Sequence, residues 1–159
     1  MSYLESAYFP APPTRPSVPR AGAAAAAPTD ERGTTMAILK TYARLWVDDL
    51  DRALPLLTEL VGAAPDLRFG FGGVELAAVG DFLVIAGPAE QRARYADASA
   101  TVVVSDLDEV VTRLAAHGGR VTVPVAASET GRFLYAEHAG GAQVEYVEWV
   151  PELVRRILG

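Results

Sequence analysis

The chain has no cysteine and only two histidines among its 159 residues. Without cysteine it can form no disulfide bond and can offer no thiolate ligand to zinc or to an iron–sulfur cluster. Histidine, aspartate and glutamate are the strong metal ligands that remain, and the first of these is scarce. The composition therefore leaves few ways to build a tight metal site.

Basic residues and long apolar runs are also scarce. Fourteen Lys and Arg stand against 20 Asp and Glu, a formal charge of −6, whereas nucleic-acid binders usually concentrate positive charge on one face. No apolar run approaches the roughly 20 residues of a membrane-spanning helix, and Glu5 stands where a leader peptide has basic residues. We expect a cytoplasmic protein with neither a nucleic-acid nor a membrane partner.

Residues 1–36 differ in composition from the rest of the chain. They hold six of the 11 prolines and an alanine run at 23–27, without a sustained apolar period. This composition is typical of disorder, so we predict a disordered tail followed by one domain over 37–159. Two alternatives stay open: the aromatic residues at 3–9 dock on the domain, or Met36 is the native start.

The first half of the domain, residues 37–90, reads as one βαβββ module. Residues 41–47 alternate like a strand, and residues 49–61 carry apolar side chains at helical spacing, with Asp49 placed as N-cap and Gly62 as the helix stop. Three short strand patterns follow, separated by glycine turns at 72–73 and 80–81.

The second half, residues 98–150, repeats the first. Asp106 lies 57 residues after Asp49, and at that offset Val104 matches Val47 and Leu107 matches Leu50. Three strand patterns again follow the helix, and residues 151–158 form a short amphipathic helix opened by proline. The sequence therefore predicts an α+β domain made of two tandem βαβββ modules, the product of an internal duplication.

The repeated motif resembles that of a known family. Val-x-Asp-Leu-Asp occurs at 47–51 and at 104–108, and EHAGGAQVEYVEW at 137–149 places Gly141 and Glu145 as the vicinal-oxygen-chelate (VOC) superfamily of glyoxalases and bleomycin-resistance proteins does. His138-Ala139 departs from that family's usual Asp-Pro. The resemblance spans about residues 38–150. It implies a curved mixed sheet, a homodimer, a small organic ligand and a role such as antibiotic sequestration or self-resistance.

The resemblance also implies four inward positions that carry the metal ligands in metal-dependent members. They correspond here to Tyr42, Val84, Ser99 and Glu145, of which Glu145 alone is a strong ligand. A catalytic site for zinc or a similar metal needs about three protein ligands. We therefore predict no metal and no cofactor.

Strand alternation brings polar and aromatic side chains to the cleft of such a sheet. The predicted ligand-binding residues are Tyr42, Arg44, Trp46, Phe69, Phe71, Ser99, Tyr135, Glu145 and Trp149. Aromatic walls with a few polar groups suit a planar or amphipathic small molecule. The pattern fits equally well an ordinary core in which Arg44 and Glu145 form a structural pair.

These residues support three functions. The first is metal-independent binding of a small organic molecule. The second is a metal-free lyase, isomerase or cyclase, with Glu145 as the candidate catalytic base and Arg44 or Tyr42 stabilising negative charge. The third is a protein-interaction module, if the protein's own side chains fill the cleft. His117 is interpreted as a helix-end residue. His138 is interpreted as a surface turn residue, with a position at the mouth of the cleft as the alternative.

Overall fold

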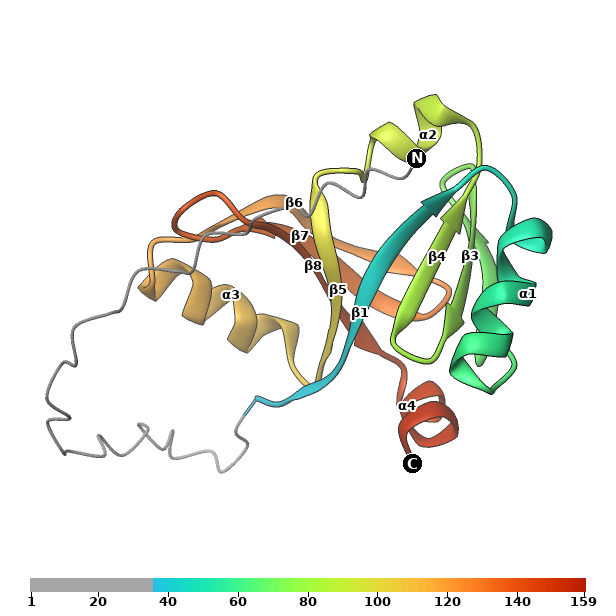
Figure 1. The fold of residues 1–159 in the computed structure, drawn as a ribbon. Helices are drawn as coiled ribbons and strands as arrows, with labels where there is room; N and C mark the ends of the chain where they lie inside the picture. The colour runs from blue at the N-terminus through green and yellow to red at the C-terminus, as the bar shows by residue number, and fades with distance from the viewer. Residues whose placement is uncertain (1–35) are drawn as a thin grey trace, which may run out of the picture. The chain divides into compact units, whose positions relative to one another are not determined.

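The computed structural model describes residues 36–159 (Figure 1). The tail predicted over residues 1–36, except Met36 itself, lies outside this range. The strands are β1 Ile38–Val47, β2 Leu67–Phe71, β3 Val74–Val79, β4 Phe82–Ala86, β5 Ala98–Val104, β6 Arg120–Ser128, β7 Gly131–Glu137 and β8 Gln143–Trp149. The helices are α1 Leu50–Val61, α2 Ala89–Ala93, α3 Leu107–Ala116 and α4 Pro151–Leu158.

All eight of these strands form one mixed sheet in the order β2-β3-β4-β1-β5-β8-β7-β6. β1 pairs in parallel with β4, and β5 pairs in parallel with β8, so each module has the same internal order. The two modules join through antiparallel pairing of β1 with β5 at the centre. This confirms the predicted fold class of two βαβββ modules in a curved mixed sheet.

The two long helices begin in the same way, as the repeat predicts. The Asp49 side chain accepts from the Arg52 backbone N–H at 3.1 Å, and the Asp106 side chain accepts from the Glu109 N–H at 3.0 Å. Each carboxylate satisfies one of the backbone donors that a helix start leaves unpaired. Gly62 ends α1 in the left-handed conformation, with φ of 76°.

Apolar side chains form separate clusters on the two faces of the sheet. On one face, which we call the outer face, α1 packs over β3 and β4, and α3 packs over β6, β7 and β8. On the other, the inner face, side chains of both modules form a single cluster. Phe71 of β2 meets Phe133 of β7 edge to face at 5.3 Å between ring centroids. The sheet therefore curls until its two distant flanks touch.

Two short helices complete the domain. α2 lies in the polar connector between the modules, where the sequence predicts no regular structure. α4 follows β8 and packs Leu153 into the inner-face cluster, with Val154 and Ile157 against it. Among residues 36–159, no helix has both the length and the apolar character needed to cross a bilayer.

Candidate functional site on the inner face

Arg44 is the most deeply buried charge of the site. It projects from β1 onto the inner face, where its side chain is 3% exposed. Its Nη1 donates to the backbone carbonyls of Tyr95 at 3.0 Å and Ala98 at 3.5 Å. Its Nη2 donates to the Tyr135 hydroxyl at 3.0 Å and lies 3.4 Å from the Glu145 carboxylate. These contacts fix the guanidinium in one place and leave its charge beside Glu145.

Glu145 receives a second donor on the same oxygen. Thr101 and Glu145 are register partners on β5 and β8, and the Thr101 hydroxyl donates to Glu145 Oε2 at 2.6 Å. Among the described residues, the other oxygen, Oε1, has no hydrogen-bond partner. Glu145 also lines the inner cavity. One carboxylate oxygen is thus held by the protein, and the other is left available to a molecule in the cavity.

The inner cavity has a volume of about 50 Å³, room for a few water molecules or a compact organic group. Its lining residues are Tyr42, Leu67, Phe69, Phe71, Leu76, Ala78, Leu83, Thr101, Ser128, Thr130, Phe133, Glu145, Val147 and Trp149. The wall is mostly aromatic and aliphatic. Besides Thr101 and Glu145, a second polar pair borders it, the Ser128 and Thr130 hydroxyls 3.1 Å apart.

Tyr42 supplies an unpaired polar atom in the cavity wall. The residue is 1% exposed, and its hydroxyl has no hydrogen-bond partner among the residues that the structure describes. Burial, reinforced by Asp66 and Asp81, raises the pKa of Tyr42 to about 12, so the hydroxyl keeps its proton at neutral pH. A buried hydroxyl without a partner is costly, and a molecule in the cavity would satisfy it.

Tyr135 lines a wider surface hollow next to the inner cavity. The hollow has a volume of about 380 Å³, and Phe71 and Phe133 line both spaces. Tyr135 stacks on Tyr95 of the connector with ring centroids 6.0 Å apart. Burial, with the Glu145 charge, raises the pKa of Tyr135 well above its usual range, so it is a neutral group that accepts from Arg44. The Phe71 and Phe133 rings thus lie between the inner cavity and this hollow.

One solved structure shows substantial sequence identity to the chain. An uncharacterized protein from Methanosarcina mazei is 34% identical, with a TM-score of 0.68, over 72% of this chain and 94% of the other. The chain belongs to the same family as this Methanosarcina mazei protein. No protein-family model matches the sequence, and neither does any curated protein.

Other solved structures, at lower identity, share the fold. Methylmalonyl-CoA epimerase from Mycobacterium tuberculosis is 22% identical, with a TM-score of 0.57, over 74% of this chain and 93% of the epimerase. A Streptomyces coelicolor epimerase variant in complex with 2-nitronate-propionyl-CoA is 14% identical, with a TM-score of 0.58, over 74% and 97%. At these identities the likeness shows the VOC fold alone.

The structure brings most of the predicted site residues together. Those that line the inner cavity are Tyr42, Phe69, Phe71, Glu145 and Trp149. Arg44 and Tyr135 border a small space that adjoins Glu145, and the Trp46 ring lies 5.3 Å from the Arg44 guanidinium. Ser99 does not join them. It is exposed at a register irregularity of β5, and its hydroxyl donates to the Gln143 carbonyl.

The structure adds residues to the site that are not among those predicted, although the sequence indicates a position on the inner face for some of them. Thr101 lies 57 residues after Arg44, so the internal repeat places it on the inner face. Phe133 alternates with Tyr135 on β7 and shares its face. Tyr95, by contrast, lies in the connector, and no periodicity there predicts that its ring returns to the site.

The sequence comparison of the two halves predicts Val84 opposite Glu145, and the structure corrects this. Register pairs Arg44 with Leu83 and Thr101 with Glu145, so Leu83 is the counterpart of Glu145. Leu83 lines the cavity, whereas Val84 is buried under α1 on the outer face. A shift of one residue moves a strand side chain to the opposite face.

The corrected positions still do not suit a divalent metal. Tyr42, Leu83 and Ser99 are weak or non-ligating residues, which leaves Glu145 as the only strong donor of the four. Among residues 36–159, no three His, Asp or Glu side chains gather as a ligand group. Arg44 further neutralises the one carboxylate. We derive no chemistry through a metal.

Proposed function

We propose that the protein is a member of the VOC superfamily that binds a small organic molecule in the inner cavity through side chains alone. The observation that carries this proposal is the buried Tyr42 hydroxyl, which lacks a partner among the described residues and borders the same cavity as Glu145. A neutral donor and a carboxylate acceptor beside one apolar space are the groups that orient a polar ligand.

The geometry also limits the ligand. The inner cavity accepts only a compact group, which Phe69, Phe71 and Trp149 would contact with their rings. A larger body would have to lie in the hollow beyond Phe133, close to Tyr95. We infer a molecule with a small polar head that donates to Glu145 and accepts from Tyr42, joined to a larger apolar or planar part.

This proposal is tested by a thermal-shift screen of small organic acids, amides and planar heterocycles, followed by tryptophan fluorescence titration of each hit. Replacing Tyr42 by Phe and Glu145 by Gln should each weaken a true hit about tenfold, because each removes one polar contact. Arg156→Gln on the exposed side of α4 is the matched control. Calorimetry with nickel, zinc and manganese should show no tight binding, and stoichiometric binding of any of them would contradict the proposal.

A second candidate is metal-free catalysis, which the position of Glu145 favours. The free Oε1 atom makes this carboxylate a candidate base for a proton next to a carbonyl group, and the Tyr42 hydroxyl is placed to stabilise the negative charge that develops. Structures of the same fold include methylmalonyl-CoA epimerase with methylmalonyl-CoA and NH4+. Incubation of confirmed ligands in deuterium oxide tests it. Deuterium incorporation that Glu145→Gln abolishes supports an enzyme, and its absence with every ligand rejects one.

The homodimer and an antibiotic ligand are proposals that rest on the VOC resemblance. Sedimentation equilibrium of the full chain tests the homodimer, because the measured mass would be twice the 16.8 kDa of one chain. Adding glycopeptide antibiotics of the bleomycin type to the same fluorescence titration tests the second.

A further inference from the structure

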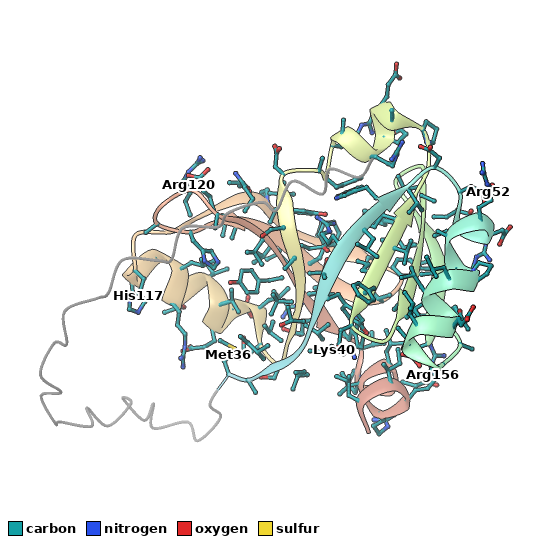
Figure 2. The ribbon with its side chains drawn as sticks, viewed as in Figure 1. Met36, Lys40, Arg52, His117, Arg120 and Arg156 are labelled. Carbon is teal, nitrogen blue, oxygen red and sulfur yellow. The ribbon has the colours of Figure 1, made fainter. Side chains whose placement is uncertain are left out.

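The outer face carries a second pocket, unrelated to the inner cavity. It has a volume of about 350 Å³ and lies among α3, the start of β1 and the turn from β7 to β8. Its lining residues are Met36, Ile38, Val110, Arg113, Leu114, His117, Gly119, His138, Ala139 and Tyr146. In Figure 2, His117 marks the end of α3 and Met36 lies beside that helix. The volume falls within the range of about 300–1,000 Å³ that is usual for small-molecule sites.

Basic side chains supply most of the polar groups of this pocket. Both histidines of the chain, His117 and His138, line it together with Arg113, and no Asp or Glu is among its lining residues within 36–159. This is notable in a chain of net charge −6. The Arg113 Nε donates to Glu109 at 2.8 Å, and its two Nη groups have no partner among the described residues. The rim therefore offers several N–H donors and the Arg113 charge, which Glu109 balances in part, and donors of this kind favour an anion.

Apart from the Tyr146 hydroxyl, the remainder of the lining is apolar. Val110 and Leu114 of α3 and Ile38 of β1 border the pocket, and Ile38 is 62% exposed. The Tyr146 ring stacks on the His138 ring with planes 14° apart, and the His138 Nε2 lies 2.7 Å from the Tyr146 hydroxyl. This contact fixes a flat wall at the end where His138 presents its imidazole.

The internal repeat indicates that the basic rim belongs to the second module alone. At the offset of 57 residues, the α1 residues that match Arg113 and His117 are Leu56 and Leu60. Both leucines are exposed. The same helical positions therefore carry donors in one module and aliphatic side chains in the other, so the rim is not a property of the fold.

We propose that this outer-face pocket binds an amphipathic organic anion, that is, a carboxylate or sulfonate on an aliphatic or aromatic body. Arg113, His117 and His138 hold the acidic head, and the body lies against Val110, Leu114 and the Tyr146 ring. The inner cavity differs in both respects, because it contains Glu145 and has about one seventh of the volume.

The test is an NMR titration of the full-length, nitrogen-15-labelled chain with octanoate. Octanamide, which has the same aliphatic body but no charge, is the control ligand. Octanoate should shift the amides of α3 and of residues 138–146 with saturation, and octanamide should bind at least about fivefold more weakly. Arg113→Gln should weaken octanoate by a similar factor. Its control, Arg156→Gln on α4, should leave binding unchanged, since Arg156 lies away from the pocket (Figure 2).

Four outcomes overturn the proposal. Equal affinity for octanoate and octanamide would show a merely apolar contact, and saturable shifts confined to Arg44 and Glu145 would place the anion in the inner cavity. Amides of the pocket that change on dilution without octanoate would show that a second copy of the chain covers it. Contacts between Tyr8 or Phe9 and Tyr146 would show that the chain's own N-terminal segment occupies it.

Discussion

Thr101 and Glu145 stand side by side on parallel strands, with the threonine hydroxyl 2.6 Å from the carboxylate oxygen that Arg44 also contacts. Arg44 comes from β1, Thr101 from β5 and Glu145 from β8, so one carboxylate oxygen links three neighbouring strands. The contacts therefore join the first module to the second. The cluster supports the centre of the sheet and also presents Glu145 to the cavity.

Replacing Arg44 by Met should destabilise the protein by about 3 kcal/mol, because it leaves the Glu145 charge, whose side chain is only 14% exposed, without its counter-ion. The carbonyls of Tyr95 and Ala98 lose their donor as well. Urea denaturation measures the change in the free energy of unfolding. The double variant with Glu145→Gln is the control, and should cost less than the sum of the two single changes. A loss below about 1 kcal/mol for Arg44→Met would show that the ion pair contributes little.

Stability should fall as the pH rises from 10 to 12, in part because of Tyr42. The folded state keeps the Tyr42 proton up to a pKa of about 12, whereas the unfolded chain releases it near 10. The folded state therefore binds more protons in this window, and the free energy of unfolding decreases with pH. Tyr42→Phe should make this decrease shallower and cost little at pH 7, since it removes an unpaired buried hydroxyl. Tyrosinate absorbance and urea unfolding across the window check both points, and an unchanged slope in the variant would refute the assignment.

Two glycines with similar backbone conformations should respond differently to alanine. Gly62 has φ of 76° and open space where a Cβ atom would lie, whereas Gly72 has φ of 56° and a Cβ there would lie 2.5 Å from the Tyr95 hydroxyl. Gly62→Ala should cost about 1 kcal/mol through backbone strain alone. Gly72→Ala should cost more and should also displace Tyr95 from its packing against Tyr135. Chemical denaturation gives the first quantity and aromatic NMR shifts the second; equal costs with Tyr95 unmoved would contradict the proposed contact.

The two acidic N-caps should be nearly interchangeable in energy. Asp49→Ala and Asp106→Ala should each destabilise by about 1 kcal/mol, because each removes one side-chain bond to a helix N–H. Asp81→Ala, at an exposed turn, is the comparison. Thermal unfolding monitored by circular dichroism measures these changes. If either substitution leaves the stability unchanged, the two N-caps are not equivalent in energy.

The sequence predicts the architecture because the pattern occurs twice, so that each module can be compared with the other. Asp49 and Asp106 mark the same point of two modules, and the match persists through the following helix. Alternation then assigned Arg44 and Glu145 to one face, which is where the structure places them. The register of the last strands is harder to predict, because glycine turns of different length precede them, and the sequence alone therefore places Val84 where the structure has Leu83.

Contacts between distant parts of the chain cannot be predicted from local sequence patterns. The return of Tyr95 to the site depends on the path of the connector, and the Phe71–Phe133 contact depends on how tightly the sheet curls. The size of the inner cavity follows from both. No local period specifies either quantity, because sheet curvature is the sum of small twists over eight strands.

The Phe71–Phe133 contact has a consequence for the speed of binding. These two rings border both the inner cavity and the surface hollow, and non-covalent packing alone holds them together. If every ligand must wait for them to part, the observed association rate will rise with ligand concentration and then level off at the rate of ring opening. Chemically different ligands would share that plateau. The protein's own opening rate, and not the chemistry of the ligand, would then set how fast the cavity fills.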